Sequence, residues 1–287
     1  MIPSFDYKTP KTLGEACNLL WEFRDTAKII AGGTDLVIGL RSGELKPQCL
    51  IDIARIDDLR RIVEENGRIS IGAGVTHSEI ASSPIIRRYG EVLSEAASWI
   101  GSPQIRNLGT LGGNIVNASP AADTVPPLMT LNAVGRILSF EGEKEVPLDQ
   151  LFKGPYETHL KPHEILAQVK FPKLSATAKS SFIRLARREA AAIARMSVAV
   201  VLQMENGRIE EIRISAGSIT PAPQRMSEAE AILKGRSPDE EGLRLAAYQV
   251  SETMIRASGI RPSTSYKKPV IEALFIRAIR KALEGSI

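Results

Sequence analysis

One glycine-rich stretch decides the fold of this chain: Ile105-Arg106-Asn107-Leu108-Gly109-Thr110-Leu111-Gly112-Gly113-Asn114-Ile115. The residues that come shortly after it are Asn117-Ala118-Ser119-Pro120-Ala121-Ala122-Asp123. A similar stretch occurs earlier in the chain: Lys28-Ile29-Ile30-Ala31-Gly32-Gly33-Thr34-Asp35-Leu36. Each stretch follows an apolar run and joins two adjacent glycines to a threonine and a short polar side chain, so the two form a pair.

The paired glycines predict a binding site for a diphosphate. Glycine has no Cβ, so several backbone N–H groups can turn toward one point and a ligand can come close. Two such turns converging on one diphosphate suit a dinucleotide as large as FAD. Neither turn has the Gly-x-x-x-x-Gly-Lys-Ser/Thr or Gly-x-Gly-x-x-Gly spacing of better-known phosphate loops. Two ordinary turns are the alternative, since Gly-Gly is a routine loop marker, but the threonines and the 119–123 tail favour the diphosphate.

The composition is that of an ordinary globular protein. The chain has 287 residues, of which 43% are hydrophobic and 24% are charged. A chain of this length is more often two domains than one. No apolar stretch is long enough to predict a membrane span, and residues 1–7 lack the basic and apolar regions of a signal peptide. These features predict a cytoplasmic protein.

Charge and the supply of metal-ligating residues exclude several functions. The net charge is +4, but the cations are spread along the chain without an aromatic-interleaved basic stripe, which disfavours nucleic-acid binding. Cys17 and Cys49 are the only cysteines, whereas an iron–sulfur cluster needs about four thiolates. His77, His159 and His163 show no zinc spacing, so we expect no metal. We expect His77 to cap a helix or to lie on the surface.

Periodicity predicts a mixture of helices and strands along the whole chain. Thr12 and Glu15 predict a capping box at the start of a helix that carries Cys17 on its apolar face. Two Asn-Gly pairs, at 66–67 and 206–207, predict tight hairpins. The polar, small-residue segment 173–180 is the expected linker between two domains. The expected helices are 12–23, 85–100, 227–233, 238–257 and 269–284, and the expected strands are 28–31, 50–53, 68–74, 134–140, 196–204, 208–215 and one ending at 171–172.

On these residues the chain resembles the FAD-binding medium subunits of the molybdenum hydroxylases, a family that includes xanthine dehydrogenase, aerobic carbon monoxide dehydrogenase and nicotinate dehydrogenase. The string Gln-Ile-Arg-Asn-x-Gly-Thr-x-Gly-Gly-Asn at residues 104–114 is long and specific. The resemblance covers essentially the whole chain. It also includes Ala31-Gly32-Gly33-Thr34-Asp35, Leu50-Ile51-Asp52-Ile53, Ile71-Gly72-Ala73-Gly74, Ile100-Gly101-Ser102-Pro103 and Arg261-Pro262-Ser263-Thr264-Ser265-Tyr266-Lys267.

The resemblance implies the fold in more detail than periodicity does. Mixed strands, helices and hairpins predict the α+β class. The family implies a two-lobed FAD-binding domain of the type shared by p-cresol methylhydroxylase and vanillyl-alcohol oxidase (PCMH/VAO type) over residues 1–173, with lobes near 1–55 and 56–173. A smaller α+β domain of the CO dehydrogenase flavoprotein C-terminal type is expected over 178–287.

The resemblance also implies a set of cofactor-binding residues. Residues 30–36 and 110–114 would clasp the FAD diphosphate between the lobes, with the amides of both glycine pairs and two threonine hydroxyls donating. Asp123 would accept from hydroxyls of the ribityl and adenosine portion, or else stabilise a loop beside prolines. Ile100 would lie close to the isoalloxazine ring, and Leu166 would pack against the cofactor. The full set is Ile29, Ile30, Ala31, Gly32, Gly33, Thr34, Asp35, Leu36, Ile100, Thr110, Gly112, Gly113, Asn114, Ser119, Asp123, Leu166 and Arg184.

One position in that set departs from the family. Relatives of xanthine dehydrogenase place a lysine where this chain has Arg184, which keeps the charge but changes the geometry and cannot lose its proton. The resemblance implies a role beside the flavin N1–C2=O edge, where a cation stabilises reduced anionic flavin. The run Ala190-Ala191-Ala192-Ile193-Ala194 also lacks an aspartate that many relatives carry. These two differences leave the electron acceptor open.

No general base, nucleophile or pair of carboxylates emerges from the sequence. The resemblance assigns the substrate chemistry to a large molybdopterin-binding subunit and the electron supply to a small subunit with two 2Fe-2S clusters, with a dimer of heterotrimers expected. This chain would then pass electrons through FAD to NAD or another acceptor. Two alternatives stay open: a self-sufficient flavin oxidoreductase of the same fold, with His77 or Tyr266 as an isolated acid or base, and a non-catalytic interaction module.

Overall fold

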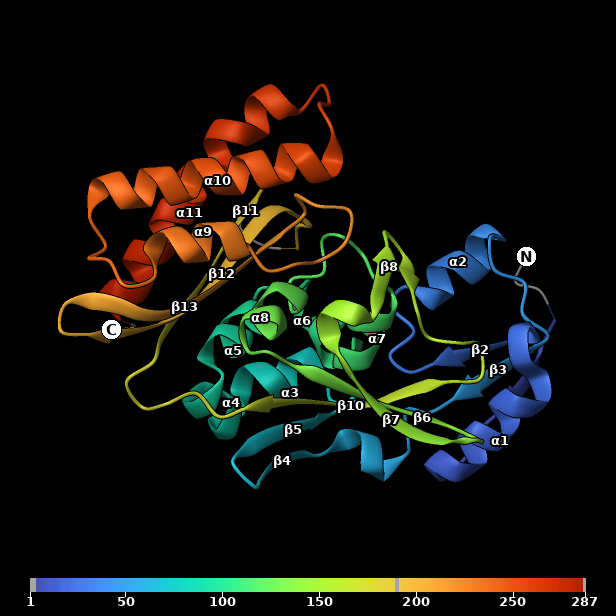
Figure 1. Cartoon of the computed structure of the whole chain (residues 1–287). Coiled ribbons are helices and arrows are strands. Elements are labelled where there is room, and N and C mark those ends of the chain that lie inside the picture. The colour runs from blue at the N-terminus through green and yellow to red at the C-terminus, as the bar shows by residue number, and fades with distance from the viewer. Residues whose placement is uncertain (1–3, 189–190, 286–287) are drawn as a thin grey trace.

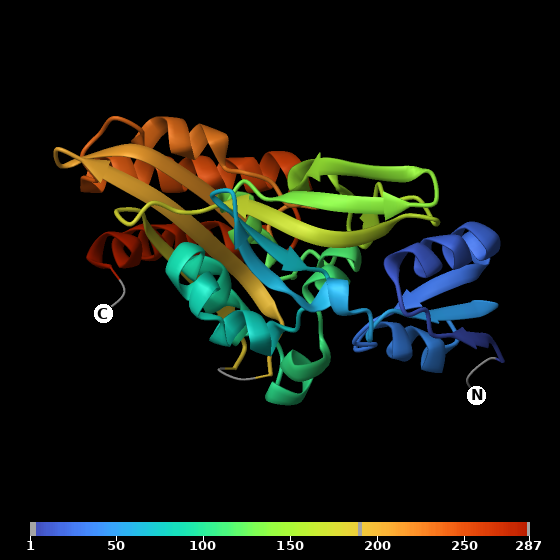
Figure 2. The same cartoon turned by 90° about the horizontal axis from the view of Figure 1, so that it is seen from below.

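A computed structural model describes residues 4–188 and 191–285 of the chain. The described residues form four β-sheets with helices packed on them, in the α+β class that the sequence predicted. The first lobe stands at one end of the molecule and the helices of the C-terminal part at the other (Figure 1). Seen from below, the described chain starts and finishes at opposite ends (Figure 2).

The first lobe is a three-stranded parallel sheet with one helix after each of its first two strands. Its elements are β1 (Asp6–Lys8), α1 (Leu13–Phe23), β2 (Ala27–Ile30), α2 (Leu36–Ser42) and β3 (Cys49–Asp52). The strand order is β1-β3-β2. Thr12 caps α1 by accepting from the Glu15 N–H at 3.2 Å, while the Glu15 carboxylate accepts from the Lys11 N–H. The buried Cys17 side chain anchors α1 in the core, as its periodicity predicted.

The second lobe is a five-stranded antiparallel sheet in the order β4-β5-β10-β6-β7 with short helices beside it. Its strands are β4 (Ile62–Glu65), β5 (Arg68–Gly72), β6 (Val134–Ser139), β7 (Gly142–Pro147) and β10 (Ile165–Pro172), and a separate small hairpin pairs β8 (Phe152–Gly154) with β9 (Glu157–Thr158). Its helices are α3 (His77–Ser82), α4 (Pro84–Tyr89), α5 (Glu91–Ser98), α6 (Pro103–Leu108), α7 (Leu111–Val116) and α8 (Val125–Thr130).

The helix expected over 85–100 is wrong as a single helix, because the chain turns at Gly90 between α4 and α5. The Gly90 backbone has φ −159° and ψ 44°, which is not helical. A Cβ at this position would lie 3.0 Å from the Phe171 ring. The apolar periodicity continues on both sides of the break, so the pattern alone could not locate it.

The C-terminal part is a three-stranded antiparallel sheet covered by three helices. Its elements are β11 (Lys179–Ala186), β12 (Ala194–Glu205), β13 (Arg208–Gly217), α9 (Ser227–Leu233), α10 (Glu240–Ser258) and α11 (Thr264–Glu284). Both predicted Asn-Gly hairpins form, with Asn66 and Asn206 at φ near +50°. The expected start of the last helix at Pro269 is wrong, because α11 begins at Thr264 and includes Pro269.

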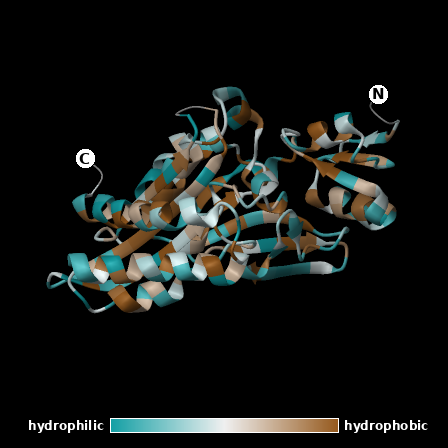
Figure 3. Cartoon of the chain, turned by 90° about the horizontal axis from the view of Figure 1, so that it is seen from above, coloured by the Kyte–Doolittle hydropathy of each residue, from teal (hydrophilic) through white to brown (hydrophobic). Residues whose placement is uncertain are grey.

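The central strand β12 separates two hydrophobic cores. Val198 and Val200 point into the core formed with α9, α10 and α11. The alternate residues Ala199 and Val201 point into the core of the first two lobes, where α5 and α8 contact this sheet. Figure 3 shows hydrophobic residues along these strands, whereas the helices alternate hydrophobic and hydrophilic residues. A strand buried on both faces explains the nearly continuous apolar run in β12.

Candidate functional site

The first glycine turn, residues 31–35, leaves its backbone amides open. It connects β2 to α2, and Gly33 has a φ of +69°, in the region that favours glycine. The Gly33 carbonyl accepts from Val37 and the Asp35 carbonyl accepts from Gly39, so the carbonyls face the helix. Within the described residues, no acceptor receives the amides of Gly32, Gly33, Thr34 or Asp35. A row of free N–H groups of this kind fits an anionic ligand.

The second glycine turn has a different construction, because its glycines lie inside the short helix α7. Thr110 is the N-cap, and its hydroxyl accepts from the Gly113 N–H at 3.1 Å. The Gly112 N–H donates to the Ala73 carbonyl at 2.8 Å, and the Asn114 N–H donates to the Thr110 carbonyl at 3.0 Å. We expected the two glycine amides to donate to a phosphate. In this structure both amides have acceptors within the protein, so their donation to a phosphate stays a prediction.

The two turns are in contact with each other. A Cβ at Gly32 would lie 1.9 Å from the Leu108 carbonyl oxygen and 3.1 Å from the Gly109 Cα. No side chain fits at position 32 unless the second turn moves away. The absence of a Cβ therefore serves the approach of two backbones as well as the approach of a ligand.

His77 lies beneath the second turn. Its side chain is buried, and its backbone N–H donates to the Gly109 carbonyl at 3.1 Å. Burial, with a smaller contribution from the Arg106 charge, lowers the pKa of His77 to about 4. Thr76 and Glu79 form the capping box of α3, so the histidine occupies the first helical position. The expectation that His77 caps a helix or lies on the surface is wrong, since it packs under the turn.

A hydrogen bond connects the second turn to the Asp123 loop. The Thr124 hydroxyl donates to the Asn114 side-chain oxygen at 2.6 Å, and Thr124 follows Asp123 directly. The Ser119 hydroxyl accepts from the Ala121 N–H at 3.3 Å, which keeps this loop compact. The structure therefore joins the two turns and the Asp123 loop through direct contacts.

Asp123 and Arg184 form a buried ion pair next to this loop. Their side chains are 6% and 5% exposed, and one Asp123 carboxylate oxygen accepts from Arg184 Nη1 at 3.3 Å. The other oxygen, Oδ1, is buried and has no partner within the described residues. Burial raises the pKa of Asp123 to about 6, although the Arg184 charge opposes this shift. An unpartnered buried oxygen acceptor requires a donor from a ligand or from water.

Arg184 is held in place by several groups. Its Nη1 also donates to the Ala192 carbonyl at 3.1 Å, and its guanidinium lies 5.1 Å from the centre of the Trp99 ring. Trp99 is one residue before Ile100, whose carbonyl accepts from Arg106 at 2.9 Å. Of the segment that the resemblance places near the flavin, Glu189 and Ala190 lie outside the described residues, as do residues 1–3 of the N-terminal stretch.

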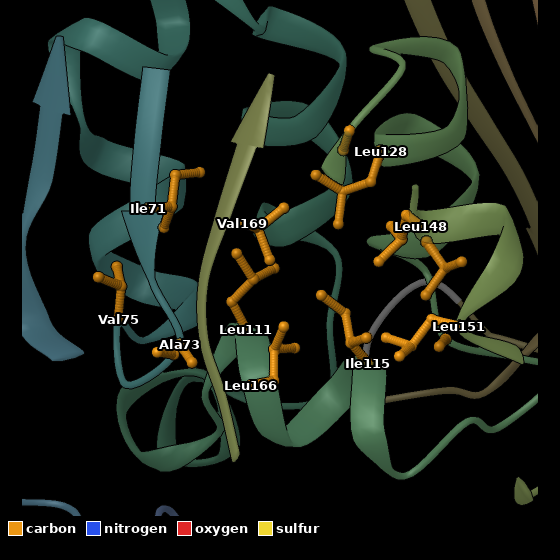
Figure 4. Packing of buried hydrophobic residues seen from close by; sticks show 14 of the residues in the cluster. Ile71, Ala73, Val75, Leu111, Ile115, Leu128, Leu148, Leu151, Leu166 and Val169 are labelled. Carbon is orange, nitrogen blue, oxygen red and sulfur yellow. The ribbon is translucent and has the colours of Figure 1, made fainter. Parts of the chain in front are cut away.

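Leu166 belongs to the hydrophobic core of the second lobe. It lies on β10 and is 4% exposed. Figure 4 shows it in the same buried cluster as Leu111 and Ile115 of α7. Ile29 and Ile30 are partly buried at the end of β2. The Leu166 and Ile29 side chains pack in or against the hydrophobic core next to the two glycine turns.

Three groups at this site were not identified from the sequence: the Trp99 ring, the Ala73 carbonyl and the Leu108 carbonyl. Trp99 had a signal, because it is an aromatic residue next to Ile100 at the end of a predicted helix. The two carbonyls had none, since a backbone acceptor leaves no trace in the side-chain pattern.

Across residues 4–188 and 191–285, no group of three or more His, Cys, Asp or Glu side chains is arranged to hold a metal ion. None of the described helices is both long enough and apolar enough to span a membrane.

Open amides in one lobe, a second turn packed against them and an unpartnered buried carboxylate oxygen form a candidate site for an anionic ligand between two lobes. Two family models match the chain. The FAD binding domain in molybdopterin dehydrogenase matches residues 3–174, and the CO dehydrogenase flavoprotein C-terminal domain matches residues 181–282.

Several known proteins are similar over nearly their whole length. The nicotinate dehydrogenase FAD-subunit of Eubacterium barkeri is 34% identical over 94% of this chain and 93% of its own. The putative xanthine dehydrogenase FAD-binding subunit of Escherichia coli is 31% identical over 98% and 96%. A structure of carbon monoxide dehydrogenase from Hydrogenophaga pseudoflava covers 99% of both chains at 32% identity, with a TM-score of 0.93.

The chain belongs to the family of FAD-binding medium subunits of the molybdenum hydroxylases. FAD is its cofactor and oxidoreduction its class of activity. The two-lobed FAD-binding fold with a further C-terminal domain is confirmed by the same comparisons. The open amides of the first turn and the unpartnered Asp123 Oδ1 fit this cofactor. The diphosphate of FAD needs hydrogen-bond donors, and the hydroxyls of FAD need an acceptor.

Proposed function

We propose that this chain is the electron-transfer subunit of a molybdenum hydroxylase complex and delivers electrons to NAD or to another acceptor. The observation that carries this proposal is the row of open amides in contact with the second turn, which leads on to the Asp123–Arg184 pair. We further propose a domain division into residues 1–173, with lobes near 1–55 and 56–173, and 178–287.

The residues of the first turn would bind the diphosphate. The amides of Gly32, Gly33 and Thr34 are available as donors. Each hydrogen bond to a charged group contributes roughly 1.5–3 kcal/mol, so a few of them account for tight noncovalent retention. The Thr34 hydroxyl, 3.3 Å from the Asp35 carboxylate, adds a further donor that can turn toward the ligand.

Asp123 and Arg184 would act further along the cofactor. The free Oδ1 of Asp123 is a suitable acceptor for a ligand hydroxyl. The Arg184 guanidinium is oriented by Asp123, Ala192 and Trp99. A fixed positive charge beside the flavin favours its reduced anionic form. FAD, when bound, supplies a carrier that exchanges electrons singly with an iron–sulfur protein or as a pair with a two-electron acceptor.

The expected partners are a large molybdopterin-binding subunit and a small subunit with 2Fe-2S clusters, with a dimer of heterotrimers in the cytoplasm. Names of several relatives support a multisubunit setting, since one is a carbon monoxide dehydrogenase medium chain. The two cysteines of this chain are free and buried, so an iron–sulfur cluster would have to come from a partner. A self-sufficient enzyme is less well supported, because His77 is buried under the second turn.

The absorption spectrum of the purified chain tests this function, with the released cofactor identified after denaturation. We expect stoichiometric FAD without iron or molybdenum. Co-expression with the expected large and small subunits should give a complex in which substrate reduces the flavin. A chain that binds no FAD, alone or in that complex, would contradict the proposal.

Gly33→Val provides a sharper test of the first turn. A valine at φ +69° is strained, and its side chain would crowd Ile30 and Val37, at 3.3 Å from the added Cβ. We expect loss of bound FAD with the C-terminal part still folded. Gly43→Val is the matched control, since Gly43 has a φ of +79° and open space around it. Full FAD occupancy in the Gly33 variant would contradict the assignment of the first turn as the diphosphate-binding site.

A further inference from the structure

A pocket of about 140 Å³ lies between the Ser119–Pro120 loop and the C-terminal helices. It has no assigned role in the cofactor site described above. Its lining residues share one property, which is that none of them is acidic. They are Pro120, Pro155, Ser218, Ile219, Thr220, Pro221, Met254, Ser258, Gly259, Arg261, Ser263, Thr264 and Lys267.

Two cations in the pocket wall are held by backbone carbonyls. Lys267 is partly buried, and its Nζ donates to the Ser218 carbonyl at 2.9 Å. The Arg261 Nε donates to the Ser258 carbonyl at 3.0 Å. Each cation keeps further N–H donors after this one bond. Both charges are therefore oriented before any ligand arrives.

These cations form no ion pair with a carboxylate of the described residues. Within residues 4–188 and 191–285, no carboxylate forms an ion pair with Lys267, Arg261 or the nearby Arg195. Burial first, and then the charges of Arg261 and Arg195, lower the pKa of Lys267. Bringing like charges together without an opposite charge is unfavourable. Other half-buried lysines of this chain do have carboxylate partners, such as Lys268 with Glu252 at 2.5 Å.

The remaining polar groups of the pocket suit an oxyanion. The hydroxyls of Ser263 and Thr264 lie at the start of α11, beside the two cations. Thr264 Oγ1 accepts from the Arg261 N–H at 2.8 Å, which leaves its own hydrogen for a ligand. Pockets for drug-sized ligands are about 300–1,000 Å³, so this one takes a smaller group. Cations and hydroxyls around so small a volume match a phosphate group.

We propose that this pocket binds a phosphate group, either as free inorganic phosphate or as the phosphate of a nucleotide. The pocket is connected to the Asp123 loop (residues 119–123), because the Ser218 N–H donates to the Pro120 carbonyl at 2.9 Å. Lys267 is bonded to that same serine. A bound phosphate therefore fixes the C-terminal helices against the loop that carries Asp123. The site exists whether or not the flavin function is as proposed.

The test is calorimetric titration of the full FAD-loaded chain with inorganic phosphate and, separately, with AMP. We expect one saturable site in the millimolar range or tighter. Lys267→Gln and Arg261→Gln should each weaken binding roughly tenfold or more, since each removes a charge-assisted hydrogen bond. Lys234→Gln is the control, because Lys234 is exposed and distant from the pocket lining. Binding of AMP with the same losses identifies a nucleotide as the source, and binding of phosphate alone identifies the free ion.

The proposal is overturned if neither compound binds saturably, or if both variants bind phosphate as tightly as the unmodified chain. Arg261 is exposed, so its variant keeps the test valid even if Lys267→Gln does not fold. The FAD content of each variant is measured in parallel. Unchanged FAD content with lost phosphate binding separates this site from the flavin site.

Discussion

The turn at residues 31–35 leaves its amides open, whereas the turn at 109–114 has its amides satisfied by the protein. In the first, Gly33 adopts a positive φ and the carbonyls face α2. In the second, the Gly112 and Gly113 amides donate to Ala73 and Thr110. The sequences of the two turns share paired glycines, a threonine and a short polar residue, yet these residues serve different purposes.

The difference shows two separate uses of a missing Cβ. At Gly33 glycine allows a backbone conformation that exposes N–H groups to a ligand. At Gly112 it allows helix α7 to lie close against Ala73, since an added Cβ would be 2.6 Å from the Ala73 Cβ. Gly32 combines both uses, because it is in the open turn and also touches Leu108. The first turn should therefore control ligand affinity, and the second should control the stability of the support beneath it.

The largest expected effect is that of Gly32→Ala. The added methyl would be 1.9 Å from the Leu108 carbonyl oxygen, so the two turns must separate and the open amides lose their position. We expect FAD affinity to fall at least about a hundredfold, equivalent to losing two charge-assisted hydrogen bonds. The measurement is bound flavin per chain after gel filtration. Gly154→Ala is the control, because no atom lies within 4 Å of its added Cβ. Equal amounts of bound flavin in both variants would contradict the proposed role of the first turn.

The second prediction concerns pH and separates the second turn from the Asp123 loop. The pKa of His77 is lowered to about 4, so the folded state binds its proton less readily than the unfolded state does. Its contribution to stability is present above pH 6.5 and is lost as the pH falls toward 4, by roughly 3 kcal/mol. The pKa of Asp123 is raised to about 6, so the stability that this group contributes changes with pH in the opposite direction. Stability from this group falls as the pH rises from about 4 to 6.

Single variants should reveal these two opposed contributions. In His77→Phe the positive contribution of His77 is lost, so between pH 4 and 6 the free energy of unfolding should rise less steeply with pH than in the unmodified chain. In Asp123→Asn the negative contribution of Asp123 is lost, so the slope should be more positive than in the unmodified chain. The measurement is urea unfolding of the FAD-free chain at several pH values. Identical slopes in the two variants would mean that neither group titrates as its surroundings indicate.

The sequence predicted the elements whose signals are local. The two Asn-Gly hairpins and helix α9 form as expected, because their determinants lie within a few residues. Of the predicted capping box only the Thr12 half forms, since the Glu15 carboxylate accepts from the Lys11 N–H and not from that of Thr12. The turn at Gly90 was missed, because the apolar periodicity runs through it and the Phe171 ring, which a side chain at position 90 would crowd, lies far away in sequence. The paired glycines located both turns. They could not show which amides stay open, because that depends on the Ala73 carbonyl.

The smallest expected effects come from a pair of substitutions within the second turn. A methyl at position 112 would meet Ala73, whereas one at position 113 would meet only the Thr110 hydroxyl at 2.9 Å, which can rotate. Gly112→Ala should lower the free energy of unfolding by about 1–3 kcal/mol through overpacking. Gly113→Ala should be nearly neutral, because the gain in helix propensity offsets the loss of cap geometry. Both are measured by urea unfolding without FAD. If Gly113→Ala instead abolished FAD binding as strongly as Gly32→Ala, the second turn would also donate its amides to the ligand, and the distinction between the turns would be wrong.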